Sequence, residues 1–247
     1  MTDSQSIQIF LNREALSRAA AERLAEVVEA TVAARSRVAV ALAGGSTPRR
    51  LYELLAETHR DRLPWDRIYL FWGDERFVPA DHPASNYRMA HDALLRHVPL
   101  PPDHVFPIPT DAASPAQAAD AYTATLRHFF DNSEPAFDLT LLGLGDDGHT
   151  ASLFPENTPQ TALTEGDAGP QVEAVVAPPR YEIRPRITLT LPAINASRHV
   201  FFLVAGEGKR DVLHTVLHDA DSTLPAAFVR AQETLTWLVD KAAYGNE

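Results

Sequence analysis

The stretch VAVALAGGSTPRR, residues 38–50, decides the fold class of this chain. Its first six residues, 38–43, are all apolar, and such a run is typical of a parallel strand that is covered on both faces. Two glycines end the run. Thr47 followed by Pro48 is then a typical helix start, with a capping hydroxyl before a proline in the first turn. The stretch therefore predicts one strand–turn–helix unit.

The same alternation continues on both sides of this unit. Residues 13–35 have apolar side chains at helical spacing, and apolar runs of strand length alternate with further helical segments. This pattern predicts βαβ units, so we expect an α/β fold: one domain over 1–247 with a mostly parallel, open, modified Rossmann-like sheet flanked by helices. The other expected strands are 7–11, 68–72, 137–142, 172–177, 187–191, 199–205 and 235–239, and the other expected helices are 85–97, 116–130 and 208–218.

The composition excludes several classes of protein and site. The 247 residues carry a net charge of −11, so the chain lacks the positive charge that neutralises phosphates, and we expect no nucleic-acid partner. There is no cysteine, which excludes disulfides, thiolate zinc sites and a cysteine nucleophile. The longest apolar runs have six residues, against about 20 for a membrane span. Residues 1–14 show no secretory signal, so we expect a cytoplasmic protein without a membrane partner.

Ligands of open parallel sheets bind beyond the carboxyl ends of the strands, and three polar motifs follow expected strands. The first is GGSTPRR, residues 44–50. Gly44 and Gly45 allow a ligand to approach the backbone, Ser46 and Thr47 add hydroxyls, and the N–H groups of a helix start favour an anion. The motif predicts a cradle for a phosphate or a sugar phosphate. The alternative is a tight strand-to-helix turn.

The second motif is GDERFVP, residues 73–79, directly after the expected strand 68–72. Charged residues at the end of an apolar strand need partners if they are buried. Arg76 could bind an oxyanion or a phosphate, and Asp74 or Glu75 could bind sugar hydroxyls or move protons. A solvated turn is the alternative interpretation.

The third motif is LGLGDDGHTASLFP, residues 142–155. Its glycines match the G-x-G-x-x-G dinucleotide fingerprint, but Asp146 and Asp147 lie between them and would repel a pyrophosphate. The loop instead presents Asp147 close to His149, and a carboxylate beside an imidazole fixes its tautomer and raises its basicity, as a general base requires. A structural histidine is the alternative.

Further cations lie at the same edge or near it. Lys209, in the GEGKRD motif after the expected strand 199–205, could bind a phosphate. Arg180, Arg184 and Arg186 form the remaining basic cluster. They lie at the end of a proline- and glycine-rich segment, 155–185, which we interpret as an excursion or a lid.

We expect no metal and no cofactor. His214 and His218 have the i, i+4 spacing of metal ligands on one helix face, but Thr215 follows where a metalloprotease has glutamate, and no third ligand is evident. The first glycine loop lacks the lysine and the spacing of a Walker loop, so a nucleoside triphosphate is not implied.

Taken together, these motifs resemble those of the 6-phosphogluconolactonase family. The matching blocks occur in the family's order over about residues 38–210: GGSTP at 44–48, GDERFVP at 73–79, SNY at 85–87, LGLGDDGHTASLFP at 142–155, RITLTLPAIN at 186–195 and GEGK at 206–209. The resemblance implies an α/β fold shared with glucosamine-6-phosphate deaminases and related to the ribose-5-phosphate isomerase and CoA-transferase group. It also implies hydrolysis of 6-phospho-D-glucono-1,5-lactone to 6-phosphogluconate in the oxidative pentose phosphate pathway, without a cofactor.

Two alternatives remain. Glucosamine-6-phosphate deaminases look similar around the first glycine loop but typically carry D-E-Y and D-G-H-I-A-F-N-E-P. Here Arg76 follows the two acids, and Phe154 replaces the acidic residue that assists ring opening. A non-catalytic sugar-phosphate sensor would have no reason to keep Asp147 and His149 on an exposed loop.

The resemblance and the chemistry of a lactone together suggest a mechanism. Ester hydrolysis needs an activated water and stabilisation of the developing oxyanion. The chain has no G-x-S-x-G elbow, so water attack with His149 as general base is favoured over an acyl-enzyme. Asp147 would orient His149, and Arg76 would stabilise the lactone oxygen or position the ring. The first glycine loop, Arg186 and Lys209 would hold the phosphate. The sequence does not decide which cation contacts the phosphate and which contacts the lactone carbonyl. It also does not decide the oligomeric state.

Overall fold

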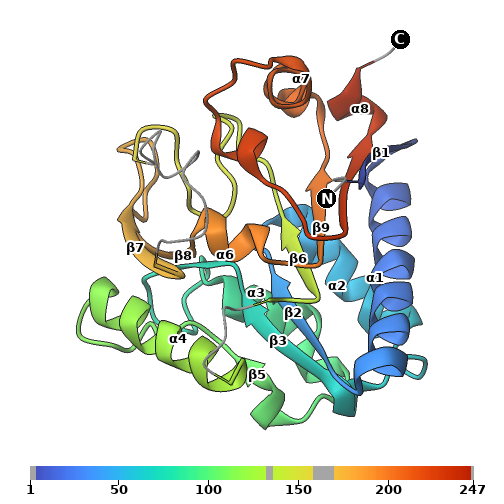
Figure 1. Ribbon diagram of the computed structural model, residues 1–247, viewed down its shortest axis with the longest axis vertical. Coiled ribbons are helices and arrows are strands. Elements are labelled where there is room, and N and C mark those ends of the chain that lie inside the picture. The colour runs from blue at the N-terminus through green and yellow to red at the C-terminus, as the bar shows by residue number, and fades with distance from the viewer. Residues whose placement is uncertain (1–3, 132–135, 158–169, 246–247) are drawn as a thin grey trace.

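A seven-stranded parallel sheet forms the centre of the computed structural model, which describes residues 4–131, 136–157 and 170–245 (Figure 1). The strand order is β1-β10-β9-β6-β2-β3-β5, and each neighbouring pair is parallel. The predicted α/β class with a mostly parallel sheet is therefore confirmed. The strands are β1 Ser4–Phe10, β2 Val38–Leu42, β3 Ile68–Trp72, β5 Val105–Phe106, β6 Leu139–Leu142, β9 His199–Val204 and β10 Thr234–Asp240.

The central strands are buried on both faces, as the unbroken apolar run at 38–43 predicts. Every residue of β2 and of β6 is buried. Helix α1 packs against β2 and β10 and also against α2, so these helices and strands share one core. The helices are α1 Arg13–Arg35, α2 Ser46–Thr58, α3 Asn86–Ala93, α4 Pro115–Phe129, α6 Leu191–Asn195, α7 Arg210–His218 and α8 Lys241–Tyr244. The short 3₁₀ helices are η1 Trp65–Arg67, η2 Leu95–His97, η3 Pro102–His104, η4 Glu207–Lys209 and η5 Pro225–Phe228.

A second, smaller sheet lies beside the first, with α4 packed against it (Figure 1). It contains three antiparallel strands in the order β4-β8-β7: β4 Asp74–Arg76, β8 Pro185–Leu189 and β7 Val172–Val176. The alternative interpretation of 73–79 as a solvated turn is wrong for β4, in which Asp74 and Glu75 are buried. Three charged residues have no strand-like pattern, and they form a strand because their backbone pairs with β8, more than a hundred residues later.

Several predicted boundaries shift by a few residues. Ser85 caps α3 as expected, because its Oγ accepts from the N–H of Arg88 at 3.1 Å, but α3 ends at Ala93 and η2 follows it. The segment 155–185, expected to be a lid, contains β7, while its residues 158–169 lie outside the described residues. The expected one-domain organisation over 1–247 stays a prediction.

The strand order explains how distant motifs come together. Strands β9, β6, β2 and β3 are neighbours, and all four are parallel, so their carboxyl ends meet at one edge of the sheet. Between β6 and β2 the chain changes direction across the sheet, and the loops that follow these strands diverge. Such a switch point is where open α/β sheets bind ligands.

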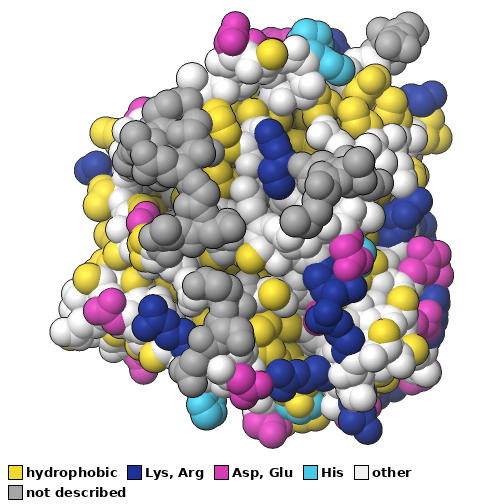
Figure 2. Space-filling model, in the orientation of Figure 1, with side chains coloured by type: hydrophobic (Ala, Val, Ile, Leu, Met, Phe, Trp, Pro, Cys, Tyr) yellow, Lys and Arg dark blue, Asp and Glu magenta, His cyan; other side chains and the backbone are white. Residues whose placement is uncertain are grey.

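Figure 2 shows the surface of the protein in the orientation of Figure 1. Basic and acidic side chains are interspersed on this face, with hydrophobic side chains between them. In the described parts of the chain, no helix combines the length and the apolar character needed to cross a membrane.

Candidate active site

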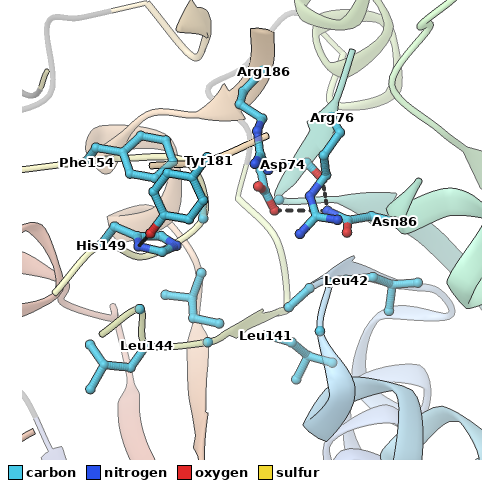
Figure 3. Close-up of a pocket in the computed structure, with 18 of the residues that line it drawn as sticks. Leu42, Asp74, Arg76, Asn86, Leu141, Leu144, His149, Phe154, Tyr181 and Arg186 are labelled. Atoms are coloured by element: carbon cyan, nitrogen blue, oxygen red, sulfur yellow. Dashed lines mark hydrogen bonds between the residues drawn. The ribbon is translucent and has the colours of Figure 1, made fainter. Parts of the chain in front are cut away.

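A cavity of about 330 Å³ opens at this edge of the sheet (Figure 3). It lies within the size range of small-molecule sites, about 300–1,000 Å³. Leu42, Leu141 and Leu144 lie along its base, and polar side chains form two opposite walls. The predicted site residues that line it are Gly44, Gly45, Asp74, Arg76, His149, Arg186 and Lys209.

One wall is the histidine loop, residues 143–149, which follows β6 and carries His149. Nδ1 of His149 lies 2.5 Å from Oδ1 of Asp147, and the same oxygen accepts the N–H of His149 at 3.2 Å. Residue 145 must be glycine for this arrangement, because a Cβ on Gly145 would lie 1.9 Å from Nδ1 of His149. The structure therefore brings the predicted pair together. Asp147 lies behind His149 and does not line the cavity.

The charge of Asp147 determines which nitrogen of His149 carries a proton. Burial alone would raise the pKa of Asp147, but hydrogen bonds from His149 and Arg180 outweigh burial and hold this pKa well below its usual range. An ionised carboxylate can only accept hydrogen bonds, so Nδ1 must be the donor. Neutral His149 then has a free lone pair on Nε2.

The opposite wall carries two arginines side by side. Arg76 of β4 and Arg186 of β8 are direct partners in the small sheet. Nη1 of Arg76 donates to the carbonyl of Ala84 at 2.7 Å, and Nε of Arg186 donates to the carbonyl of Ile183 at 2.9 Å. Burial lowers the pKa of Arg186, and the neighbouring Arg76 lowers it further. Among the described residues, neither guanidinium forms an ion pair with a carboxylate, so this wall is suited to an anion.

Asp74 is held on the same wall by neutral donors. Its Oδ2 accepts from Oγ of Ser152 at 2.6 Å, and its Oδ1 accepts from Nδ2 of Asn86 at 3.3 Å. Asn86 also lines the cavity, and a Cβ on Gly44 would lie only 2.0 Å from its Oδ1. The sequence analysis assigned no role to Asn86, although the SNY motif at 85–87 was the signal that could have found it.

Glu75 turns away from the cavity. Its carboxylate accepts the N–H groups of Arg76, Asn86 and Tyr87 at 2.7–2.8 Å and the Oγ of Ser85 at 3.0 Å. Only 2 % of Glu75 is exposed, and burial raises its pKa although these donors partly oppose the shift. The structure places this predicted substrate-binding residue behind the wall, where it orders the start of α3.

The first glycine loop reaches the cavity through its backbone. Gly44 and Gly45 line the cavity at the start of α2, whereas the side chains of Ser46 and Thr47 do not. The first N–H groups of a helix have no partner within it, so they face a ligand without rearrangement.

Lys209 lines the cavity from η4 and pairs with Asp146, a largely exposed residue of the histidine loop. The exposed fraction of the side chain is 82 % for Asp146 and 25 % for Lys209. An incoming phosphate would therefore compete with Asp146 for this ammonium group.

The sequence analysis missed Tyr181, which lines the cavity, and placed Arg180 only in a basic cluster. The Tyr181 ring stands edge-on to that of His149, with centroids 5.7 Å apart and planes at 88°. Arg180 pairs with Asp147 from outside the cavity. No signal in the sequence links residues 180–181 to a loop thirty positions earlier.

The other histidine pair that the sequence analysis considered lies apart from this site. His214 and His218 lie on α7, outside this cavity, with ring centroids 4.9 Å apart. Within residues 4–131, 136–157 and 170–245, no group of three or more His, Cys, Asp or Glu side chains could hold a metal ion.

Comparison with known proteins gives consistent matches. Residues 11–237 match the family described as glucosamine-6-phosphate isomerases/6-phosphogluconolactonase. A 6-phosphogluconolactonase from Synechocystis sp. is 44 % identical over 245 residues, which cover 97 % of each chain. The solved structure of 6-phosphogluconolactonase from Trypanosoma brucei has a TM-score of 0.85 at 32 % identity and covers 98 % of each chain. A monomeric glucosamine-6-phosphate deaminase has a TM-score of 0.80 at 20 % identity, covering 96 % of this chain and 98 % of that one, which concerns the fold alone.

Proposed function

This chain belongs to the glucosamine-6-phosphate isomerase and 6-phosphogluconolactonase family, and we infer that it hydrolyses 6-phospho-D-glucono-1,5-lactone to 6-phospho-D-gluconate in the pentose phosphate pathway. One observation supports the chemistry above all others. His149, with an ionised Asp147 on its Nδ1, faces the same cavity as two arginines that have no carboxylate ion pair among the described residues. A base and an anion-binding wall are the two elements that hydrolysis of a phosphorylated lactone requires.

We propose that His149 is the general base. Its Nε2 removes a proton from a water molecule as the water oxygen attacks the lactone carbonyl carbon, and Asp147 stabilises the imidazolium that forms. The tetrahedral intermediate then collapses, the ring C–O bond breaks, and the proton passes from His149 to the leaving ring oxygen. The sum of the steps is the addition of one water to one lactone.

The arginines and the glycine loop divide the remaining tasks. In this proposal the 6-phosphate is bound by the backbone at 44–45, directly before α2, and by Arg186 and Lys209, because each supplies positive potential at the cavity. Arg76 is then left for the carbonyl oxygen, where negative charge develops. Asp74 is left for sugar hydroxyls.

The test is direct hydrolysis. Freshly prepared 6-phosphogluconolactone is added to the enzyme, product is coupled to phosphogluconate dehydrogenase, and the spontaneous rate is subtracted. We expect rapid turnover by the wild-type protein and none from glucosamine 6-phosphate in a parallel ammonia-release assay. Release of ammonia without lactone hydrolysis would favour the deaminase alternative, and tight binding of 6-phosphogluconate without either reaction would favour the sensor.

Three further expectations remain proposals: a cytoplasmic location, the absence of a nucleic-acid partner, and activity without a metal or cofactor. Retention of full activity after dialysis against EDTA would support the last of these. Loss of activity that a divalent ion restores would contradict it.

A further inference from the structure

The turn between β7 and β8, residues 177–184, crosses next to the histidine loop. Its two ends are joined, because the N–H of Ala177 donates to the carbonyl of Arg184 at 2.7 Å and Nε of Arg184 donates back to the carbonyl of Ala177 at 2.9 Å. The middle of this closed turn carries Arg180 and Tyr181, and Figure 3 shows Tyr181 lying over His149.

Both oxygens of Asp147 are engaged, and the turn supplies the partners of the second one. Oδ1 bonds His149, while Oδ2 accepts from Nη2 of Arg180 and from the hydroxyl of Tyr181 at 3.2 Å. Nη1 of Arg180 also donates to Oε1 of Glu156 at 2.6 Å. The carboxylate of Asp147 therefore cannot rotate away from His149 without losing its contacts to the turn.

The imidazole is confined by rings as well as by hydrogen bonds. Its centroid lies 4.7 Å from that of Phe154 and 5.7 Å from that of Tyr181, and these two rings contact each other with centroids 5.2 Å apart. The hydroxyl of Tyr181 is also 3.3 Å from Nδ1 of His149. The three rings therefore form a triangle, in which Phe154 and Tyr181 together cover one side of the imidazole and limit its rotation toward that side.

We propose that Arg180 and Tyr181 are positioning residues that hold Asp147 and His149 in the orientation a general base needs. Arg180 fixes the carboxylate, and Tyr181 fixes both the carboxylate and the plane of the ring. This inference rests on the proposed role of His149. Neither residue has to touch the reacting atoms, so their removal lowers turnover more than it weakens substrate binding.

The primary experiment compares Arg180→Met with Arg184→Met, which removes a guanidinium from the same turn but not from Asp147. Arg184→Met loses the side-chain bond to Ala177, but the backbone bond from the N–H of Ala177 to the carbonyl of Arg184 remains and keeps the turn closed. Arg180 is half exposed, so we expect a moderate effect, a fall in kcat of about five- to tenfold with KM changed less than about twofold. Arg184→Met should leave kcat near wild type. Arg180→Lys should restore part of the loss, since an ammonium can still reach Asp147.

The pH profile gives a readout that a purely structural defect would not move. The charged or titratable groups around His149 are Asp147 and Asp146 on its own loop, Arg180 and Tyr181 on the turn, Lys209 on η4, and Asp74, Arg76 and Arg186 across the cavity. The variants compared leave all of these except Arg180 or Tyr181 in place. Removal of the Arg180 charge favours the protonated imidazole, so the acid limb of kcat should move to higher pH in Arg180→Met. Tyr181→Phe removes no charge, so it should lower kcat about two- to fivefold without this movement.

Three outcomes separate this inference from the proposed function. If His149→Asn is inactive but Arg180→Met keeps wild-type kcat and the same acid limb, the positioning role is wrong and the base assignment stands. If Arg184→Met loses as much activity as Arg180→Met, the effect belongs to the turn as a whole and the inference is also overturned. If His149→Asn is fully active, the base assignment itself fails.

Discussion

The two walls of the cavity are held in place by different interactions. One wall, called here the loop wall, is the histidine loop at 143–149. Ion pairs such as that between Arg180 and Asp147 fix this loop, and the side chain of Arg180 is 44 % exposed. The opposite wall, called here the strand wall, is formed by β4 and β8. Its acidic residues Glu75 and Asp74 are buried and accept hydrogen bonds from neutral groups such as the hydroxyls of Ser85 and Ser152. Exposed ion pairs contribute little to stability, whereas a buried acceptor that loses its donors is costly. We therefore expect defects in the loop wall to change turnover and defects in the strand wall to change binding or folding.

The largest expected effect is that of His149→Asn on the loop wall. A positioned general base contributes about 10² to 10⁴ in rate, so kcat should fall by that factor while KM and the melting temperature change little. A thermal melt and steady-state kinetics on the same preparation measure both. A folded variant with near wild-type kcat would remove His149 from the mechanism.

The pH profile of the wild-type enzyme should show an acid limb that belongs to His149. A protonated imidazole cannot accept a proton from water, so kcat falls as the pH falls. Asp147 cannot cause this limb, because its lowered pKa keeps it ionised throughout mild acid. The stability that its contacts supply is present above the ordinary pKa of aspartate, about 3.9, and is lost only as the pH falls through the lower folded-state value. A melting temperature that drops in parallel with kcat between pH 7 and 5 would contradict this assignment.

On the strand wall, Arg186→Met should raise KM for the phosphorylated lactone about tenfold or more, because hydrogen bonds between charged groups contribute about 1.5–3 kcal/mol. The same variant should unfold at an equal or higher temperature, since it removes a buried cation beside Arg76. Arg67→Met, on η1, is the matched control. Equal losses on phosphorylated and unphosphorylated gluconolactone would show that Arg186 does not bind the phosphate.

Matched Glu→Gln changes, each at a glutamate that supports one of the walls from outside the cavity, test the difference in stability. Glu75→Gln directs an amide NH₂ at N–H and O–H donors and should lower the free energy of unfolding by about 1–3 kcal/mol. Glu156→Gln, whose partner is the half-exposed Arg180, should leave that free energy nearly unchanged. Urea unfolding measures both. If the two variants were equally stable, the proposed contrast between the walls would be wrong.

The smallest expected effect concerns the pair of Asp146 and Lys209. Asp146→Asn frees the ammonium group and removes a negative charge that repels the phosphate, so KM should fall about two- to threefold at low salt. Added salt should remove the difference. Asp211→Asn, an exposed carboxylate on α7, is the control. A higher KM would mean that Asp146 holds Lys209 in its binding position.

The walls also differ in how well the sequence predicted them. The parallel sheet and the loop after β6 follow from local patterns, namely the apolar run at 38–43 and the glycines around His149. The strand wall depends on long-range pairing: β4 exists because β8 lies beside it, and Glu75 is buried because α3 covers it. The contacts of Arg180 and Tyr181 with Asp147 and His149 were missed for the same reason. Residue type indicated which groups carry charge, but only the fold determined which of them face the cavity.

The position of β1 at the edge of the large sheet has a consequence for synthesis on the ribosome. In the described sheet β1 pairs only with β10, whose first residue, Thr234, comes more than two hundred residues later. At roughly 5–20 residues per second, the first strand waits about 10 to 45 seconds for its partner to be translated. During that time its backbone N–H and C=O groups and the side chain of Ile9 are open to other chains. Early protection of this segment by a chaperone would therefore raise the yield of folded enzyme.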